Sequence, residues 1–542
     1  MCYLYKEEHN FRSNNIIVKN EQQNSNEQQN LNDQILQTLS SNNNDMSKLT
    51  AFVEAWQTKN IDFIKNIFLG YHFPFDACLQ SLFDSNVLLA LNEITINITN
   101  HPNISFYALE TIYRLTTIHE ECMNFFLSPQ IQLQNFIKDL LYNSAKGSPI
   151  DEPILLICAQ FCYYICYQYP ERIELLQKIQ MFETFILFMK SSFDDYLDNG
   201  DGSCTKQIEI EKYIIKTMNI IIMEGKNNNE QEFRNAMSII YFNIFNYEKR
   251  DRAFLYEPAC DLFQHIIMKN PQFISILDTF DILKKLNFLI CESEYSTLEL
   301  VPIFKLLGNI LSYYHKDYDL ILQEDKSNHN LNSSHNDNSN QNDNRNHNVK
   351  SVADIIHELA LQIDGSSVFG YLTDDYDSLN SEEYDPIYTN IFFLLSHLFI
   401  ELDHIPDDIC INPLLEVVKK VMDEGRSELK CKMLYFFSEY CKLSAPKDLA
   451  ILLDSEFFQT LFDYLETYDD KVCYKFLDLI DCFISKYGRY GFESENIKRM
   501  LNETVPEFIL HLLQDCISEQ VELKAKLIMK NNYDNYVPLC NK

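Results

Sequence analysis

One helical phrase returns along this chain at nearly constant spacing. Each copy is an apolar stretch with side chains of the same kind at three- and four-residue steps, followed by a polar break and a second amphipathic stretch. Copies occupy residues 110–118, 303–310, 431–440 and 472–484. A helix-only period of about 40–47 residues predicts a stack of helical repeats, in which each unit buries its apolar face against the next. Equivalent points in successive copies are Thr217, Asp261, Lys305, Tyr435 and Asp478, with steps of 44, 44, 130 and 43 residues; we interpret the long step as three short ones.

Composition agrees with a helical stack. The 542 residues are too many for one compact core, and 46% of them are hydrophobic. There are only 11 glycines and 15 prolines, which fits long helices with short connections. We therefore predict an all-α fold, a right-handed α-solenoid of about eight to ten repeats.

The repeats are predicted to be interrupted by polar segments. Residues 1–46 are rich in Asn and Gln, and residues 326–350 contain ten Asn, so we predict that both are disordered because they cannot bury a helix face. The helical repeats are then expected at 47–325 and 351–533, with a C-terminal tail at 534–542.

Cysteine placement bears on the compartment. Most of the 16 cysteines lie in apolar helical stretches, as Cys158, Cys162 and Cys166 do, and the first residues lack the basic start and apolar run of a secretory signal. Reduced, buried thiols and a cytoplasmic or nuclear location are the expectation. No stretch approaches the ~18 uninterrupted apolar residues of a membrane span, so no membrane segment is predicted.

The net charge of the chain indicates which kinds of partner its surface favours. The chain has 79 Asp or Glu against 45 Lys or Arg, a net charge of −34, which disfavours nucleic acid and anionic lipid as partners and favours a basic protein or peptide. Residues 351–418 hold fourteen acidic residues and no Lys or Arg. They are interpreted either as a solvated acidic loop or as a contact for a basic partner, with candidates Asp374, Asp375, Asp377, Glu382 and Glu383.

The repeats resemble armadillo repeats, and most of all those of the importin-alpha family. Residues 110–119 follow that family's third-helix phrase with Tyr113 at the Trp position, and residues 307–310 reproduce its Leu-Gly-Asn-Ile core. Residues 476–484 are similar to the family's C-terminal phrase, and the resemblance covers residues 75–530. It implies armadillo-like repeats whose concave groove holds an extended basic peptide, as a nuclear-import adaptor does. The groove residues it implies are Tyr113, Glu121, Asn309 and Tyr435.

The chain also departs from that family. Its single Trp, Trp56, lies outside the expected ladder of groove tryptophans, and Thr117 stands at an Asn position. Residues 1–46 contain only three basic residues, so the basic segment with which the family binds its carrier protein is absent.

No pattern predicts catalysis, a metal or a cofactor. The Asp198–Gly202 segment lacks the ligand spacing of a calcium loop, and three cysteines on one helix face are interpreted as core side chains because no fourth metal ligand is evident. The sequence therefore predicts a non-enzymatic protein- or peptide-binding solenoid. The alternative is a structural scaffold or regulatory subunit that joins folded partners.

Overall fold

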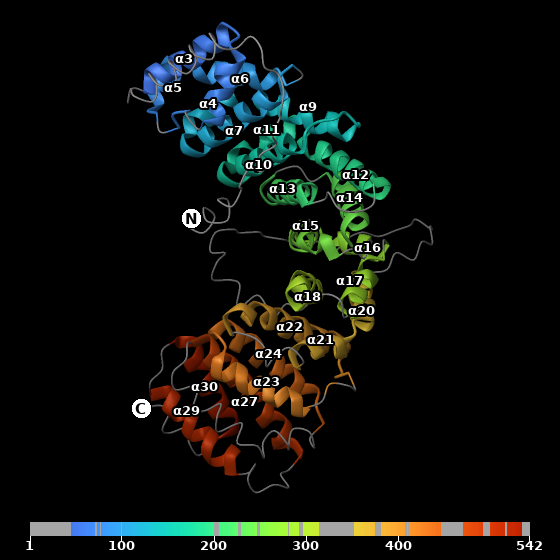
Figure 1. Ribbon diagram of the computed structural model, residues 1–542. Coiled ribbons are helices and arrows are strands. Elements are labelled where there is room, and N and C mark those ends of the chain that lie inside the picture. Colours follow the sequence, from blue (N-terminus) through green and yellow to red (C-terminus); the bar gives the residue numbers. More distant parts are fainter. Residues whose placement is uncertain are drawn as a thin grey trace, which may run out of the picture. The chain divides into compact units, whose positions relative to one another are not determined.

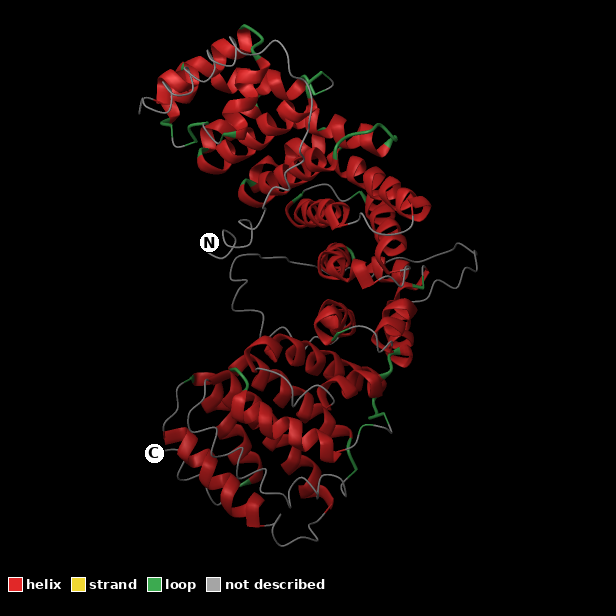
Figure 2. Cartoon of the chain, viewed as in Figure 1, coloured by secondary structure: helices red, strands yellow, loops and turns green. Residues whose placement is uncertain are grey.

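The computed structural model confirms an all-α chain. It describes residues 45–533 except 71–72, 76, 99, 200–204, 226–228, 246–249, 280, 292–295, 314–351, 374–380, 407–408, 410, 446–469, 491–498 and 515–517. Throughout these residues the regular structure is helical, with no strand (Figure 2). The segments predicted to be disordered lie outside the described residues, except that helix α3 already begins at Asp45.

The chain divides into two compact units, Met1–Ile137 and Lys138–Lys542. The first unit packs α3 against α4, α5 and α6, and α7 against α6 and α8. Phe52 in its core contacts the rings of Phe68 and Phe73, and Trp56 donates a hydrogen bond from Nε1 to Glu93. Its helices are α3 (Asp45–Gln57), α4 (Ile61–Leu69), α5 (Leu79–Asp84), α6 (Val87–Ile96), α7 (Pro102–Ile118) and α8 (Glu120–Phe126). Helix α9 (Leu133–Ala145) crosses the boundary.

The second unit contains a continuous series of helices, which we call the helix row. Each member packs against the next, and Figure 1 shows α13, α15 and α18 side by side, viewed nearly along their axes. The row consists of α10 (Glu152–Gln168), α13 (Thr205–Glu224), α15 (Tyr256–Lys269), α18 (Thr297–Ser312), α22 (Ser381–Leu402), α24 (Ser427–Leu443), α27 (Asp470–Tyr490) and α30 (Glu519–Asn532).

Further helices pack beside the row, and several of them contact one another, as α12 contacts α14 and α17 contacts α20 and α21. Their buried side chains, such as Phe185, Met237 and Leu286, close the core between the two layers. They are α11 (Ile173–Lys178), α12 (Met181–Asn199), α14 (Glu230–Ile240), α16 (Ile274–Thr279), α17 (Ile282–Cys291), α20 (Val352–Gln362), α21 (Gly365–Thr373), α23 (Ile411–Glu424) and α29 (Val505–Gln514). Short turns of 3-10 or π-helix complete the layer: η2 (Pro170–Arg172), η3 (Tyr241–Phe245), η4 (Arg250–Leu255), η5 (Pro271–Phe273) and η8 (Met500–Thr504).

Polar residues ahead of apolar stretches start several of these helices. Ser296 and Glu299 form a capping box at α18, and the side chains of Asn229 and Ser518 accept backbone N–H groups at the starts of α14 and α30. Such caps satisfy N–H groups that the helix itself leaves without acceptors.

The row corrects one interpretation of the repeat spacing. Helix α22 packs directly between α18 and α24, so the 130 residues from Lys305 to Tyr435 cover two steps of the row. The interpretation of that distance as three short steps is therefore wrong. The added length is the chain between α18 and α20, which contains the Asn-rich residues 326–350.

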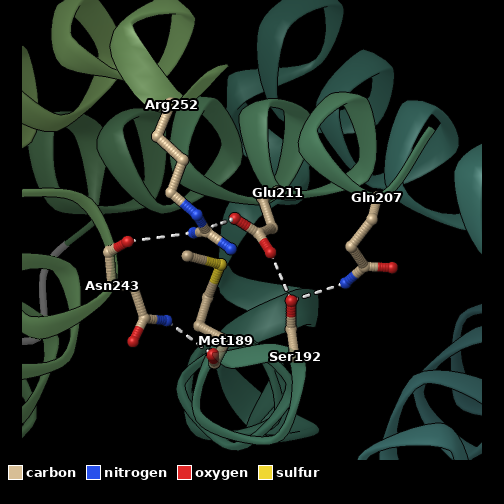
Figure 3. A network of polar contacts seen from close by, with 6 residues as sticks. All are labelled: Met189, Ser192, Gln207, Glu211, Asn243 and Arg252. Atoms are coloured by element: carbon tan, nitrogen blue, oxygen red, sulfur yellow. Dashed lines mark hydrogen bonds and ion pairs between the residues drawn. The ribbon is translucent and has the colours of Figure 1, made fainter. Parts of the chain in front are cut away.

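A buried polar network joins the two layers where α12, α13, η3 and η4 meet (Figure 3). Arg252 donates from Nη1 to Glu211 and to the backbone oxygen of Asn243, each at 3.0 Å. Glu211 also accepts a hydrogen bond from Ser192. The side chains of the ion pair are 2% and 0% exposed, so its two charges are withdrawn from water. Asn243 adds a hydrogen bond of 2.6 Å from its side chain to the backbone oxygen of Met189.

Candidate protein-binding surface

Side chains on successive row helices contact each other at repeat spacing. Hydrogen bonds and ion pairs join residues 42 to 46 positions apart. We call this series, together with the ring contacts that continue it, the contact ladder. It confirms the predicted repeat period by direct contact between neighbouring helices of the row.

The ladder is polar from α13 to α18. His265 lies 2.7 Å from Asn219, and burial lowers the pKa of His265, although nearby Asp261 opposes that shift. Lys305 pairs with Asp261 at 3.2 Å, which confirms that these two predicted equivalent points are neighbours. Asn309 donates to Gln264 at 2.9 Å, so the predicted peptide-binding amide contacts the adjacent helix.

Tyrosines take the place of the polar pairs on α10 and α13. Tyr163 stacks on Tyr167 at 5.6 Å between ring centroids and lies 5.7 Å from Tyr213. Tyr167 is exposed, and burial raises the pKa of Tyr163. This end of the row therefore presents flat aromatic surface of the kind that anchors peptide side chains.

Gly308 lets α18 and α22 approach closely. A Cβ atom on Gly308 would lie 2.6 Å from Cδ1 of Phe393 and 3.4 Å from Cα of Leu394. The glycine in the Leu-Gly-Asn-Ile phrase therefore has a packing role in this chain.

Substitution of Gly308 by Ala is expected to destabilise the second unit. Ala is the better helix former by about 1 kcal/mol, but overpacking at this contact costs about 1–3 kcal/mol. We expect a net loss of about 1 kcal/mol, measured as a lower thermal midpoint. Gly147 has a positive φ and nothing within 4 Å of its would-be Cβ, so Gly147→Ala tests backbone strain without packing. An unchanged midpoint for Gly308→Ala would contradict the close contact.

Aromatic rings and lysines continue the ladder from α22 to α27. Nζ of Lys432 lies 4.3 Å from the ring centroid of Phe393, and Nζ of Lys475 lies 4.9 Å from that of Tyr435. Tyr435 also lies 6.0 Å from the ring of His397. Burial lowers the pKa of Lys432 to about 8, so its ammonium is held in a partly dry site.

The last steps of the ladder are charged. Lys486 donates to the backbone oxygen of Ser444 at 2.6 Å, and burial lowers its pKa. Lys524 pairs with Asp478 at 3.0 Å and with Asp481 at 3.2 Å. Although burial by itself lowers the pKa of Lys524, these two carboxylates raise it overall.

The predicted groove residues are only partly brought together. Asn309 and Tyr435 both belong to the row, on α18 and α24, with α22 between them. Tyr113 is half-buried on α7, and Glu121 is exposed in the first turn of α8. Both belong to the first unit, so their role in a common groove stays a prediction.

The acidic candidates are mostly outside what the structure describes. Asp374, Asp375 and Asp377 are not among the described residues, and Glu382 and Glu383 lie near the start of α22. Their neighbour Asp385 is described: its carboxylate accepts the backbone N–H of Arg426 at 3.2 Å. That carboxylate is therefore used within the fold, at the start of α24.

The lysines of the ladder were not among the predicted site residues. Lys432 and Lys475 are 43 residues apart, which is one repeat step, so this spacing could have linked them. In the sequence they look like ordinary surface charges, and only the packed helices show that they lie over rings.

The described residues bring no three His, Cys, Asp or Glu side chains into a group that could hold a metal ion. Cys158, Cys162 and Cys166 are buried in α10, and burial raises the pKa of Cys162 to about 12. They are core side chains. Within the described part of the chain, no helix is both long enough and apolar enough to cross a membrane.

Comparisons with known proteins bear on the fold. No family model and no curated protein matches the sequence. Among solved structures, an engineered protein aligns with a TM-score of 0.54 and 12% identity, over 90% of this chain and 98% of its own. SYS-1, a β-catenin-like armadillo protein, aligns with a TM-score of 0.50 and 11% identity, over 94% of this chain and 86% of its own.

These likenesses define the class of fold. Together with the helix row and its contact ladder, they show an all-α helical-repeat solenoid. At 11–12% identity they concern the fold alone. The closer resemblance to importin-alpha stays a prediction.

Proposed function

We propose that this chain is a non-enzymatic protein-interaction solenoid that holds an extended segment of a partner along the helix row. The contact ladder carries the proposal, because it includes half-buried amide, aromatic and charged side chains, such as Asn309, Tyr435 and Lys475, on helices that follow one another in the row. Packed helices lie about 8–10 Å apart, and an extended chain rises about 3.3 Å per residue. A bound segment would therefore advance about three residues for each helix crossed.

The finer prediction, a nuclear-import adaptor for basic segments, is one form of this proposal. Asn309 and Tyr435 on the row support it, and the acidic composition of residues 351–418 favours a basic partner. The scaffold or regulatory subunit is the other form, in which folded partners contact the covering helices and loops. We further propose a cytoplasmic or nuclear location, which the burial of thiols such as Cys260 as core side chains supports.

The proposal can be tested without assuming the charge of the partner. Random 16-residue peptides would be selected on the full chain, and those selected measured against an Asn309→Ala/Tyr435→Ala variant. We expect a loss of affinity of at least roughly 10-fold, because truncation of two central contact residues removes about 1.4 kcal/mol or more. Phe254→Ala, at a side chain 72% exposed on η4, is the control and should leave affinity unchanged.

The same experiment separates the alternatives. Selected peptides that lose no affinity in the Asn309→Ala/Tyr435→Ala variant would refute binding along the row. A chain that selects no peptide but forms a stoichiometric complex with a folded protein would favour the scaffold. Enrichment of Lys and Arg in the selected peptides would support the import-adaptor form.

A further inference from the structure

Charge is unevenly distributed along the helix row. Its last three helices, α24, α27 and α30, together contain ten Lys or Arg and seven Asp or Glu, whereas the whole chain has 45 against 79. On these three helices basic residues thus outnumber acidic ones, which is the reverse of the balance in the whole chain. Charges are screened over about 8–10 Å at physiological salt, so a bound segment responds to this local balance more than to the net charge of −34.

Several acidic side chains on these helices already pair with lysines. Glu439 accepts from Lys442 at 2.6 Å, and Asp478 and Asp481 both contact Lys524. Lys475, which is 16% exposed, lies 3.6 Å from Asp478. Three lysines thus pair with these three carboxylates, which are largely neutralised within the fold.

Lys432 and Lys486 are two further lysines of these helices, and both have known contacts within the fold. Lys432 lies over the ring of Phe393, and Lys486 donates to the backbone oxygen of Ser444. Burial lowers the pKa of each, which means that the surroundings of each ammonium compensate it less fully than water does. A carboxylate brought beside either group would restore that compensation.

We propose that Lys432, Lys475 and Lys486, here called the lysine strip, bind the carboxylates of an acidic segment of a partner protein. The rings of Phe393 and Tyr435 lie beneath the first two lysines and restrict the positions of their ammonium groups. This inference rests on the proposed function, because it names the chemistry of the segment that the row holds. The acidic composition of the whole chain predicts a basic partner, whereas this inference gives the end of the row an acidic one.

A short protein segment fits the strip better than a long polyanion does. The excess of Lys and Arg is confined to three helices, whereas a long polyanion would extend beyond them onto the rest of a strongly acidic chain. Carboxylates spaced along a short extended peptide can match Lys432 on α24 and Lys475 and Lys486 on α27 separately.

The lowered pKa of Lys432 links binding to proton uptake. The charged groups that affect Lys432 are Glu428, which raises its pKa, and Lys475, which lowers it, besides the thiol of Cys431, which raises it. Near pH 8.5 the free protein carries Lys432 mostly neutral, because its pKa is about 8. A docked carboxylate raises that pKa, so binding must take up a proton.

The test uses the full chain and a fluorescein-labelled 16-residue peptide in which Glu and Asp alternate with Ser and Leu. Its affinity would be compared with that of the same peptide with Gln and Asn in place of the acids. We expect the acidic peptide to bind at least roughly 10-fold more tightly at 50 mM salt, and to lose affinity at 200 mM salt.

Matched variants locate the contact. Lys432→Met/Lys486→Met should weaken binding of the acidic peptide by roughly 10-fold or more. The control, Lys526→Met/Lys530→Met, removes two lysines from exposed positions on α30. These positions are two and six residues after Lys524, so they face away from the side of the helix on which Lys524 lies. The control should change affinity less than about 2-fold. Lys432→Met/Lys486→Met removes two partly buried ammonium groups, so the thermal midpoint of this variant should not fall below that of the wild type.

Calorimetry at pH 8.5 in two buffers of different protonation enthalpy provides an independent readout. Wild-type protein should take up roughly half a proton or more on binding, and Lys432→Met close to none. Equal binding of acidic and amide peptides, equal losses in the two double variants, or tighter binding of single-stranded DNA would overturn the inference. If neutral or basic peptides still bind along the row, the proposed function survives that outcome.

Discussion

Replacement of Arg252 by Met is expected to lower the free energy of unfolding of the second unit by about 3–5 kcal/mol. The guanidinium is 2% exposed and bonds at 3.0 Å to Glu211, whose side chain is 0% exposed. Without Arg252, the Glu211 carboxylate stays buried and keeps the hydrogen bond from Ser192, but it loses the guanidinium that neutralises its charge (Figure 3). An isolated buried charge is among the most costly groups in a folded chain. Urea unfolding followed by circular dichroism measures the loss, and hydrogen exchange should show it first in α12, α13 and η3.

Two further variants identify the cause. Arg252→Met/Glu211→Leu removes both charges, so most of the lost stability should return. Arg114→Met breaks the exposed ion pair with Glu110 on α7, whose side chains are 46% and 31% exposed, and should cost less than about 0.5 kcal/mol. A double variant as unstable as Arg252→Met would show that packing of the long side chain, rather than the buried charge, explains the effect.

Much of the fold could be predicted because one physical pattern repeats. Apolar residues at three- and four-residue spacing indicate helices, and the return of the phrase every 43–44 residues indicates a stack. The ion pair between Asp261 and Lys305 confirms that equivalent points on successive helices meet. Where the chain between α18 and α20 lengthens the spacing, the pattern could no longer count repeats, because loop length is independent of the number of packed helices.

Contacts outside the repeated helical phrase could not be foreseen. Arg252 and Glu211 are 41 residues apart, close to one repeat step, but they lie on elements of different kinds, η4 and α13, and the sequence around them contains no signal for their pairing. The strip lysines were missed for a related reason. Whether a lysine on a helix points into solvent or over a neighbouring ring depends on how two helices are rotated and spaced, as Phe393 beneath Lys432 illustrates. Asn309 and Tyr435, two of the groove residues that the resemblance implies, do lie on helices of the row, because both belong to the repeated phrase.

Replacement of Phe436 by Ala is expected to cost about 3–5 kcal/mol and to loosen the end of the row that carries the lysine strip. Phe436 is fully buried on α24, and its ring lies 5.4 Å from that of Phe392 and 5.3 Å from that of Phe399, both on α22. Phe436 and the preceding residue, Tyr435, have different roles on the same helix. Phe436 packs α24 onto α22, whereas Tyr435 belongs to the contact ladder. The loss is measured as a lower urea midpoint.

The matched control for Phe436→Ala is Phe254→Ala, the same change at a ring 72% exposed, which should stay within about 0.5 kcal/mol of the wild type. If the packing of α24 on α22 positions Lys432 over Phe393, Phe436→Ala should also weaken the acidic peptide at temperatures where the chain is still folded. Hydrogen exchange would then show faster opening of α24 with α15 unchanged, since stability in a repeat stack is largely a sum of neighbour contacts. Uniform loss of protection from α10 to α30 would contradict that local coupling and would indicate that the row unfolds as one cooperative unit.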